Sequence, residues 1–245
     1  FGLTGTLDGT QTHQLVLEGL FGPVNNIVTT KELMDKKTLA NLKIKCVVLK
    51  HPPIREKMTY AEELQYLVGN EKRNNFINDL LLHLNGNTLC LFQLVEKHGK
   101  ILYEQISTLV KDRKVFFVYG GVNSLEREKI REIVENEKDA IIIASFGTFS
   151  TGINIRNLHN IVFSSPSKSK IRVLQSIGRG LRVTKSKMEV LVFDIADDIS
   201  YKERRNFTLT HFMKRINIYN EQQFAYEISR VNLKWIQLHH IKLLN

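Results

Sequence analysis

The sequence has few of the residues that support disulfide, metal or membrane chemistry. Its only two cysteines, Cys46 and Cys90, each lie inside an apolar run, which predicts buried thiols rather than a disulfide. No cluster of histidine and cysteine has the spacing of metal ligands, so we expect no metal site formed by these residues. No apolar run is long enough to span a bilayer, and no charged-then-apolar signal sequence occurs. We therefore expect a soluble cytoplasmic protein without a membrane partner.

Acidic residues are also in the minority. There are 25 Asp and Glu against 35 Lys and Arg, a formal net charge of +10. This excess favours an anionic partner, usually nucleic acid, although a basic surface without such a partner is an alternative. The hydrophobic share of 42% is ordinary for a globular protein, and 245 residues suffice for one large domain or for one and a half.

Short apolar strands alternate with amphipathic helices along most of the chain. The predicted strands cover residues 44–49, 88–94, 115–118, 140–144, 160–163 and 189–194. The predicted helices cover residues 10–20, 60–84 with a break at Gly69 and Asn70, 97–110, 124–134, 147–151 and 170–182. This alternation is typical of an α/β fold, a parallel sheet with helices on both faces. Right-handed crossovers bring the carboxyl ends of the strands to one edge, so we expect ligands in the loops that follow strands.

The pattern changes after residue 198. In order come a basic cluster, an amphipathic helix, a strand and an ambiguous end: Lys202, Arg204 and Arg205, then 207–224, 224–233 and 235–244. We expect this region to pack on the sheet, with contact to nucleic acid as an added role. The alternative is a structural lid whose basic cluster is solvated.

The segment QSIGRGLR, residues 175–182, carries two arginines in a predicted helix. Arg179 and Arg182 are three residues apart, so both would lie on one face of the helix. A guanidinium group can donate two hydrogen bonds at once to phosphate oxygens. Gly178 and Gly180 would allow a backbone or a nucleotide to come close. The pattern indicates a polyphosphate site, and a solvated basic helix is the alternative.

Four segments occur in the order and spacing of motifs III, IVa, V and VI of the superfamily 2 helicases: TGT at 4–6, YGG at 119–121, SFGTFSTGINI at 145–155 and QSIGRGLR at 175–182. On these motifs residues 1–200 resemble this superfamily. The segments LTGTLDG, LEGLFGPV and KELMDKKTLANLKIK are similar to its phage recombination helicases. The resemblance implies a RecA-like parallel sheet of the P-loop NTPase type with helices on both faces, and a mostly helical C-terminal extension.

The resemblance also divides the chain. Residues 1–25 would end a first RecA-like domain, 26–200 would form the second, and 201–245 would be the basic and aromatic extension. The first segment holds the residues that would couple ATP to DNA, namely Thr4, Gly5 and Thr6. The family's phosphate-gripping lysine loop and its Mg²⁺-binding acidic motif are expected upstream, because neither GxxxxGK[ST] nor a DExH or DEAD string occurs. This chain alone is therefore expected to be inactive.

Carried over residue by residue, the resemblance implies an ATP site. Arg182 matches the arginine finger and Arg179 its companion, both directed at the γ-phosphate, where charge spreads during hydrolysis. Gln175 stands near the nucleotide, while Gly152 and Asn154 approach the ribose and phosphates. The cofactors would be ATP and Mg²⁺, and the other wall of the site would be the N-terminal RecA-like half.

The resemblance also implies a nucleic-acid site. The residues that would contact the backbone are Tyr119, Gly120, Gly121, Thr148, Ser150, Lys168 and Lys170. The two glycines after a strand would expose backbone N–H groups to a phosphate. Such contacts are independent of sequence and sensitive to salt. Each motif also has an alternative interpretation without nucleic acid. Tyr119 would only pack at the edge of the sheet, the Gly/Ser/Thr segment would serve only as a turn, and the two lysines would be solvated.

The implied protein is an ATP-dependent DNA helicase or translocase that acts on branched recombination and replication intermediates such as forks, Holliday junctions and R-loops. Its partners would be branched or single-stranded DNA, and RNA within R-loops. A phage protein of this kind would work in the host cytoplasm. Two alternatives are a translocase subunit of a nuclease or restriction system, and a non-catalytic nucleic-acid-binding module.

Overall fold

The computed structural model describes residues 11–23, 28–152, 155–166, 169–182 and 189–235. Five of the predicted site residues lie outside these ranges: Thr4, Gly5, Thr6, Asn154 and Lys168. Their roles, and the structure of the ambiguous end from residue 236 onward, stay predictions.

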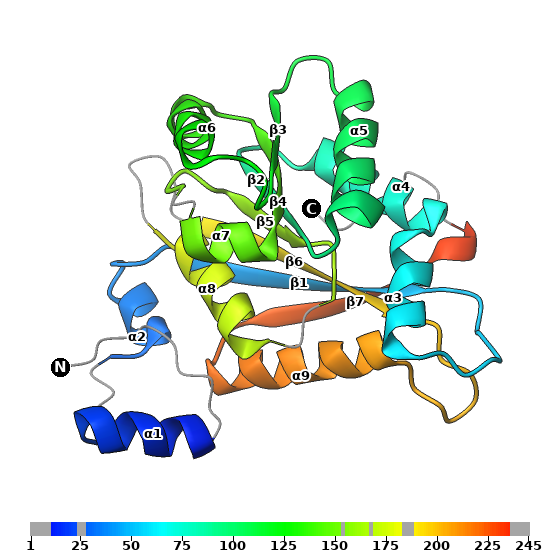
Figure 1. The fold of residues 1–245 in the computed structure, drawn as a ribbon, viewed down its shortest axis with the longest axis horizontal. Helices are drawn as coiled ribbons and strands as arrows, with labels where there is room; N and C mark the ends of the chain where they lie inside the picture. The colour runs from blue at the N-terminus through cyan, green and yellow to red at the C-terminus, as the bar shows by residue number, and fades with distance from the viewer. Residues whose placement is uncertain (1–10, 24–27, 153–154, 167–168, 183–188, 236–245) are drawn as a thin grey trace.

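The centre of the fold is one sheet of seven parallel strands (Figure 1). The strands are β1 (Asn41–Lys50), β2 (Thr88–Phe92), β3 (Val115–Val118), β4 (Ile141–Ser145), β5 (Asn160–Phe163), β6 (Glu189–Asp198) and β7 (Tyr226–Asn232). Their order across the sheet is β3-β4-β2-β5-β6-β1-β7. Parallel neighbours need crossover connections, and the helices supply them. The predicted parallel α/β sheet is confirmed.

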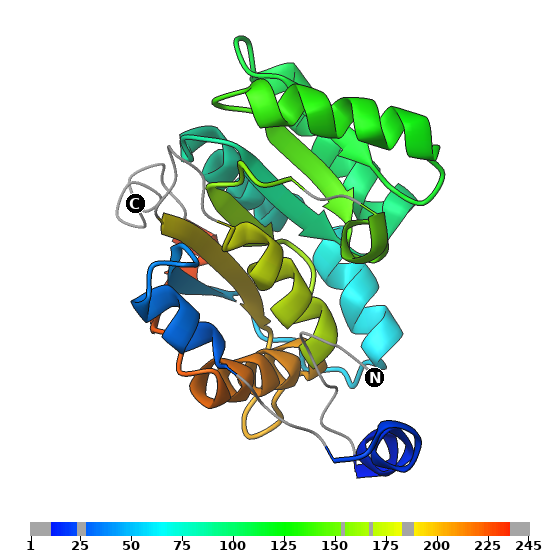
Figure 2. The same ribbon diagram turned by 90° about the vertical axis from the view of Figure 1, so that its left-hand side faces the viewer.

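Helices cover both faces of the sheet (Figures 1 and 2). The helices of the described residues, including α1, which does not cover the sheet, are α1 (Gln11–Phe21), α2 (Thr30–Asp35), α3 (Tyr60–Val68), α4 (Glu71–His83), α5 (Lys100–Leu109), α6 (Ser124–Asn136), α7 (Phe146–Gly152), α8 (Lys170–Gly180) and α9 (Phe207–Glu221). Buried side chains of α6, α7, α8 and α9 form a first core with one face of the sheet, and those of α4 and α5 form a second core on the other face.

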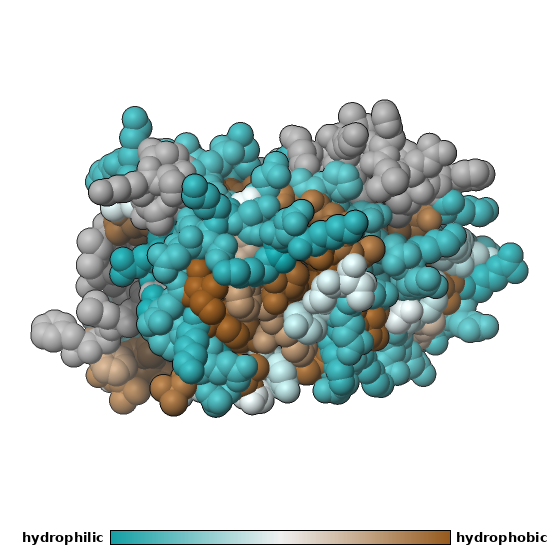
Figure 3. Space-filling view, turned by 90° about the horizontal axis from the view of Figure 1, so that it is seen from above, coloured by the Kyte–Doolittle hydropathy of each residue, from teal (hydrophilic) through white to brown (hydrophobic). Residues whose placement is uncertain are grey.

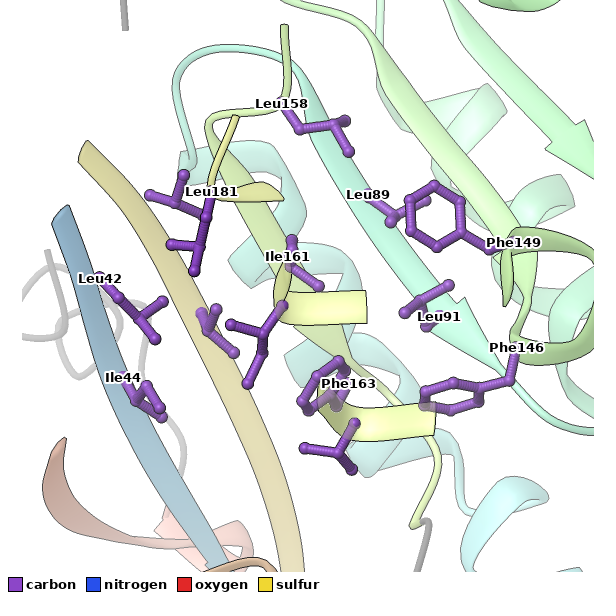
Figure 4. Close-up of a cluster of buried hydrophobic side chains, with 14 of the residues drawn as sticks. Leu42, Ile44, Leu89, Leu91, Phe146, Phe149, Leu158, Ile161, Phe163 and Leu181 are labelled. Atoms are coloured by element: carbon purple, nitrogen blue, oxygen red, sulfur yellow. The ribbon is translucent and has the colours of Figure 1, made fainter. Parts of the chain in front are cut away.

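Strand residues alternate between these two cores. In β1, Leu42 and Ile44 belong to the first core, whereas Val47 and Leu49 belong to the second. Successive side chains of a strand point to opposite faces, so a strand covered on both sides needs apolar residues at most positions. Figure 4 shows the first core, where Phe163 of β5 lies among the side chains from the neighbouring strands and helices.

Local hydrogen bonds explain where the helices begin. Thr59 and Glu62 form a capping box at the start of α3, with the Thr59 hydroxyl accepting from the Glu62 N–H and the Glu62 carboxylate accepting from the Thr59 N–H. The Asn70 side chain then accepts from the Arg73 N–H and starts α4. The predicted break at Gly69 and Asn70 is therefore confirmed.

Several element ends differ from the prediction by a few residues, most clearly the ends of β6 and β2. The predicted strand 189–194 continues to Asp198, because β6 pairs with all ten residues of β1. The predicted strand 88–94 ends at Phe92, and a single π-helical turn, Val95–Gly99, precedes α5. For β6, the pairing partner in space rather than the local sequence sets the boundary.

The region after residue 198 is built into the sheet. β7 pairs with β1 in parallel, and α9 packs against β6. Arg215 of α9 donates to Asp194 of β6, with Nη2 2.7 Å from Oδ1 and Nε 2.8 Å from Oδ2. The Tyr219 hydroxyl donates to Asp194 Oδ2 at 2.7 Å. The described part of this region therefore packs on the sheet, as expected, while Lys202, Arg204 and Arg205 of the basic cluster are exposed.

α1 lies apart from the sheet in both ribbon views (Figures 1 and 2). Its apolar side chains face outward: Leu15 and Leu20 are each 70% exposed, and Phe21 is 56% exposed. Seen from above, the rest of the surface is largely hydrophilic, with apolar residues gathered in a band through the middle (Figure 3). α1 therefore carries an apolar surface that the sheet does not cover.

Candidate functional site

α8 presents one face of the QSIGRGLR segment outward. Val173 and Ile177 are buried in the first core, whereas Gln175 and Arg179, four residues apart, are half-buried on the same side of the helix. α8 contacts α7 on one side and α9 on the other. The predicted ATP-site residues Gln175 and Arg179 therefore share a face that remains open in part.

Arg179 links α8 to α7. Its guanidinium carbon lies 5.4 Å from the centre of the Phe149 ring, a cation–π contact that orients the side chain. Burial lowers the pKa of Arg179, and the positive charge of Arg182 lowers it further. Two cations therefore act on each other here, and an anion placed between them would be attracted to both.

Arg182 is not in the helix that the sequence predicts for it. α8 ends at Gly180, and Arg182 forms an isolated β-bridge with Leu39, just before β1. The Ala40 N–H donates to the Leu181 carbonyl at 2.8 Å, which ties the end of α8 to the start of β1. The two arginines therefore come together through a bend after the helix rather than along one helical face.

The two glycines of this segment have different environments. A Cβ on Gly180 would lie 2.7 Å from Cδ1 of Ile161 and 3.2 Å from Cγ1 of Val190. Gly180 therefore lets the end of α8 come close to the sheet. Gly178 is exposed, and a Cβ there would meet nothing within 4 Å. Of the two, only Gly178 borders open space that a nucleotide could use.

α7 contains three of the predicted motif V residues, Thr148, Ser150 and Gly152. The Ser145 hydroxyl accepts from the Thr148 N–H at 3.3 Å and lies 2.8 Å from the Thr148 hydroxyl, so Ser145 caps the helix. Thr148 is only 6% exposed, and its buried position favours a structural contribution to the turn over direct contact with DNA. Ser150 and Gly152 belong to the same helix. Their contacts with nucleic acid and ATP stay predictions.

The YGG segment follows β3 at the carboxyl edge of the sheet. The Tyr119 ring packs against the Phe117 ring, with 5.1 Å between the centroids. A Cβ on Gly121 would lie 2.6 Å from Cε2 of Tyr119, so this glycine lets the chain turn over the ring. Gly120 is exposed and borders open space. The packing alternative for Tyr119 is thus supported, and of the three residues Gly120 is the best placed for a phosphate.

Lys170, which is also predicted to contact the nucleic-acid backbone, is the first residue of α8.

A buried polar cluster at the same edge is absent from the sequence prediction. Arg73 Nε donates to Asp197 Oδ1 at 2.8 Å, and Arg73 Nη2 donates to the Ser164 carbonyl at 2.7 Å. His51 Nε2 lies 2.8 Å from Asp197 Oδ1. Burial by itself would raise the pKa of Asp197, but Arg73 and His51 lower it to about 2. The cluster links α4 and β6 to the residues that follow β1 and β5. The only sequence feature that could have indicated it is the presence of polar residues at the carboxyl ends of these strands.

His98 belongs to the neighbouring loops. Its Nδ1 lies 3.0 Å from the Ser165 hydroxyl oxygen, which also accepts from the Gln93 N–H at 3.2 Å. The side chain is fully buried. Burial lowers the pKa of His98 to about 3, and the charge of Arg73 contributes to the lowering. His98 therefore holds the loops after β2 and β5 together as a neutral ring.

The two cysteines are buried thiols, as the sequence predicts. Cys46 and Cys90 are free, buried thiols, and burial raises the pKa of Cys90 to about 12. Within the described ranges, no group of three or more His, Cys, Asp or Glu could hold a metal ion. None of the described helices is both long and apolar enough to cross a membrane.

Comparison with known proteins identifies the class of this fold. Residues 71–184 match the helicase conserved C-terminal domain. With the RecA-like parallel sheet and motifs V and VI on α7 and α8, this match establishes that the chain carries the C-terminal domain of the superfamily 2 helicases.

The chain is similar to the ATP-dependent DNA helicase uvsW of Enterobacteria phage T4, with 36% identity over 253 residues, 95% of this chain and 49% of the relative. The crystal structure of T4 UvsW matches with a TM-score of 0.68 over 80% of this chain and 42% of that chain. A putative ATP-dependent helicase of Saccharomyces cerevisiae, IRC3, is 25% identical over 170 residues, 66% of this chain and 24% of the relative. The chain thus spans about half the length of UvsW.

The fold also resembles that of the DNA-bound Type ISP restriction-modification enzyme LlaBIII, with a TM-score of 0.61 at 15% identity over 93% of this chain and 18% of that chain. At this level of identity the likeness concerns the fold alone.

Proposed function

We propose that this chain is the C-terminal part of an ATP-dependent DNA helicase or translocase, in which Arg179 and Arg182 complete an ATP site. The observation that carries the proposal is the placement of Arg179, whose guanidinium lies over the Phe149 ring on the half-open face of α8. Arg182 follows just after the helix, and its positive charge adds to the effect of burial in lowering the pKa of Arg179. The similarity to a DNA helicase over nearly the whole chain supports it.

The described residues fit a bound polyphosphate. Arg179 is held over Phe149, and Gly178 beside it borders open space. Arg179 and Arg182 would bind the γ-phosphate oxygens, and Gln175 would stand beside the nucleotide. When bound, ATP supplies the phosphoryl group and Mg²⁺ neutralises charge on it. We assign the Mg²⁺ ligands and the lysine loop to a preceding RecA-like domain. α1 would belong to that domain, and its exposed apolar side chains support packing against the rest of it.

The DNA would run along the carboxyl edge of the sheet. Gly120 and Gly121 after β3 would offer N–H groups to a phosphate, with Lys168 and Lys170 after β5 as further contacts. A net charge of +10 supports a polyanionic partner. We infer branched recombination and replication intermediates as substrates, from the resemblance of the motif-flanking segments to phage recombination helicases.

The test uses the full-length protein that contains this chain. Arg182→Ala is expected to lower DNA-stimulated ATP hydrolysis by about 10³-fold or more, because an arginine finger acts on transition-state charge. DNA affinity, measured by fluorescence anisotropy, is expected to stay within a few-fold. Arg131→Ala is the matched control, since Arg131 is an α6 arginine that pairs with Glu128. Normal turnover by Arg182→Ala would refute the ATP-site assignment.

Two further results would redirect the proposal. ATP hydrolysis by residues 1–245 alone would contradict the placement of the lysine loop and Mg²⁺ ligands in another domain. DNA-stimulated ATP hydrolysis by the full-length protein without strand separation would favour the translocase alternative, such as a restriction subunit.

A further inference from the structure

Two loops leave the carboxyl edge of the sheet together. One follows β1 and the other follows β6, and both appear at the lower right of Figure 1. The His51 N–H donates to the Asp198 carbonyl at 3.0 Å, and the Ile54 N–H donates to the Ile199 carbonyl at 3.2 Å. Segments almost 150 residues apart in the chain therefore run side by side.

Arg204 fixes the shape of this pair of loops. Its Nη2 lies within donor distance of the carbonyl oxygens of Ile54 (2.7 Å), Arg55 (3.0 Å) and Glu56 (2.7 Å). Its backbone is bridged to Tyr201, with the Arg204 N–H donating to the Tyr201 carbonyl at 3.1 Å and the Tyr201 N–H donating back at 3.2 Å. Arg204 therefore has a structural contact that explains its place, and it holds the neighbouring basic residues in position.

The other basic side chains of these loops have no such explanation. Arg55, Lys57, Lys202 and Arg205 are all exposed. Among the residues that the structure describes, none of these four has a carboxylate within salt-bridge distance. Tyr201 lies between two of them, with Arg55 Cζ 5.9 Å and Lys202 Nζ 5.5 Å from its ring centre.

We propose that these two loops form a second nucleic-acid site, which we call the two-loop basic patch: Arg55, Lys57, Tyr201, Lys202, Arg204 and Arg205. Five basic side chains here stand against two acidic ones, Glu56 and Glu203. A shallow groove runs between the loops and is lined by Arg55, Tyr201, Lys202, Glu203 and Arg204. Fixed cations along a groove match the regular negative charges of a phosphodiester backbone.

The position of the patch strengthens this inference. The loop after β3, which holds Gly120, and the loops after β6 and β1 lie on the same edge, because all the strands are parallel. Five strand spacings separate β3 from β1, about 24 Å at the usual distance between strands. One DNA strand has a phosphate roughly every 3.4 Å, so about seven phosphates would span this edge. The placement along the edge rests on the proposed function, whereas the patch itself rests on its charge and geometry.

The test measures binding of the full-length protein to a fluorescein-labelled single strand of about 20 nucleotides and to a forked duplex. Arg55→Gln/Lys57→Gln/Lys202→Gln is expected to weaken binding about tenfold near 0.1 M salt. It should also reduce the slope of log K against log salt concentration by about 2 to 3, because up to three phosphate contacts are lost. Arg204 is left intact, so the loops keep their shape.

The matched control is Lys111→Gln/Lys129→Gln/Lys138→Gln, which removes the same charge from exposed lysines on α6 and on loops away from the patch. Its affinity is expected to stay within about twofold of the original, since no ordered contact is lost. Equal weakening by both triple variants would mean that only net charge matters, and this would overturn the proposal. Unchanged DNA affinity of the patch variant would also overturn it and would leave an acidic protein as the occupant to consider. Thermal unfolding checks that each variant is folded.

These outcomes are separate from a failure of the proposed function. Arg182→Ala reports on ATP hydrolysis with DNA affinity retained, whereas the patch variant reports on affinity and salt dependence. Loss of affinity in the patch variant together with normal ATP hydrolysis by Arg182→Ala would keep the patch and refute only the ATP site.

Discussion

Two pairs of arginines in this fold lie in different environments. Arg73 and Arg215 are fully buried, and each pairs with an aspartate of β6. Arg179 and Arg182 lie at the end of α8, where they act on each other as like charges. The first pair has its counterions inside the chain and fixes structure. The second lies at the surface end of α8, and we propose that it binds the phosphates of ATP.

The surroundings of Arg215 show how a buried charge is kept. Burial opposes the charged form, but Asp194 raises the pKa of Arg215 above its ordinary value. Removing charges from water costs several kcal/mol each, and only a well-placed partner offsets this. Arg215 and Arg73 thus anchor α9 and α4 to the sheet, and they contribute to the frame that holds α8.

The largest effect is expected at Arg215. Arg215→Met leaves the Asp194 carboxylate buried without its cation, which should reduce the free energy of unfolding by about 3 to 5 kcal/mol. Urea unfolding followed by circular dichroism measures the loss. Arg182→Ala should change stability by no more than about 0.5 kcal/mol, since the side chain is exposed. Equal losses in the two variants would remove the distinction between the pairs.

A smaller loss of stability is expected when the pH is lowered, and the residue responsible is the buried His98. His98 has a pKa of about 3 in the folded protein and 6.5 when unfolded. As pH falls below 6.5 the unfolded chain takes up a proton that the folded chain does not, so stability is lost. Between pH 7.5 and pH 5 this loss should be roughly 2 kcal/mol. Asp197, with a pKa of about 2, does not protonate in this range.

The measurement compares urea unfolding of the original protein and His98→Gln at the two pH values. The variant should lose less stability between them, by roughly 2 kcal/mol, whatever its stability at pH 7.5. An identical pH dependence in both proteins would show that His98 is not the titrating group.

The smallest effects separate the two glycines of α8. Gly180→Ala should destabilise by about 1 to 3 kcal/mol, because its Cβ would meet the Ile161 side chain at 2.7 Å. Gly178→Ala has open space and should stabilise the helix by up to about 1 kcal/mol. Melting temperatures of the two variants should therefore move in opposite directions, and a shift in the same direction would contradict this account of α8.

Much of the fold follows from local patterns. The apolar runs predict where six of the seven strands lie along the chain, and the alternating segment at 224–233 predicts β7. Thr59 and Glu62 form their capping box across three residues, so the sequence is enough to locate it. The helicase motifs likewise indicate the arginine site, since residue type and spacing carry that information.

The sequence did not indicate how deeply some residues are buried. Thr148 looks like an available hydroxyl in the sequence, but the first core and Ser145 enclose it. His98 looks as suited to the surface as to a ligand, and Ser165, 67 residues away, accommodates it in the interior. Burial depends on which segments arrive around a residue, and neighbours in the sequence do not report this.

The sequence by itself determined the class of fold, the alternation of its elements and the identity of the arginine segment, because these depend on periodicity and on interactions across a few residues. Only the tertiary structure decided that Arg182 leaves the helix, that Arg73 meets Asp197 across 124 positions, and that Arg204 holds a loop 150 residues away. Such pairs form where the sheet brings strand ends together. Their energies depend on burial and distance, which exist only once the chain has folded.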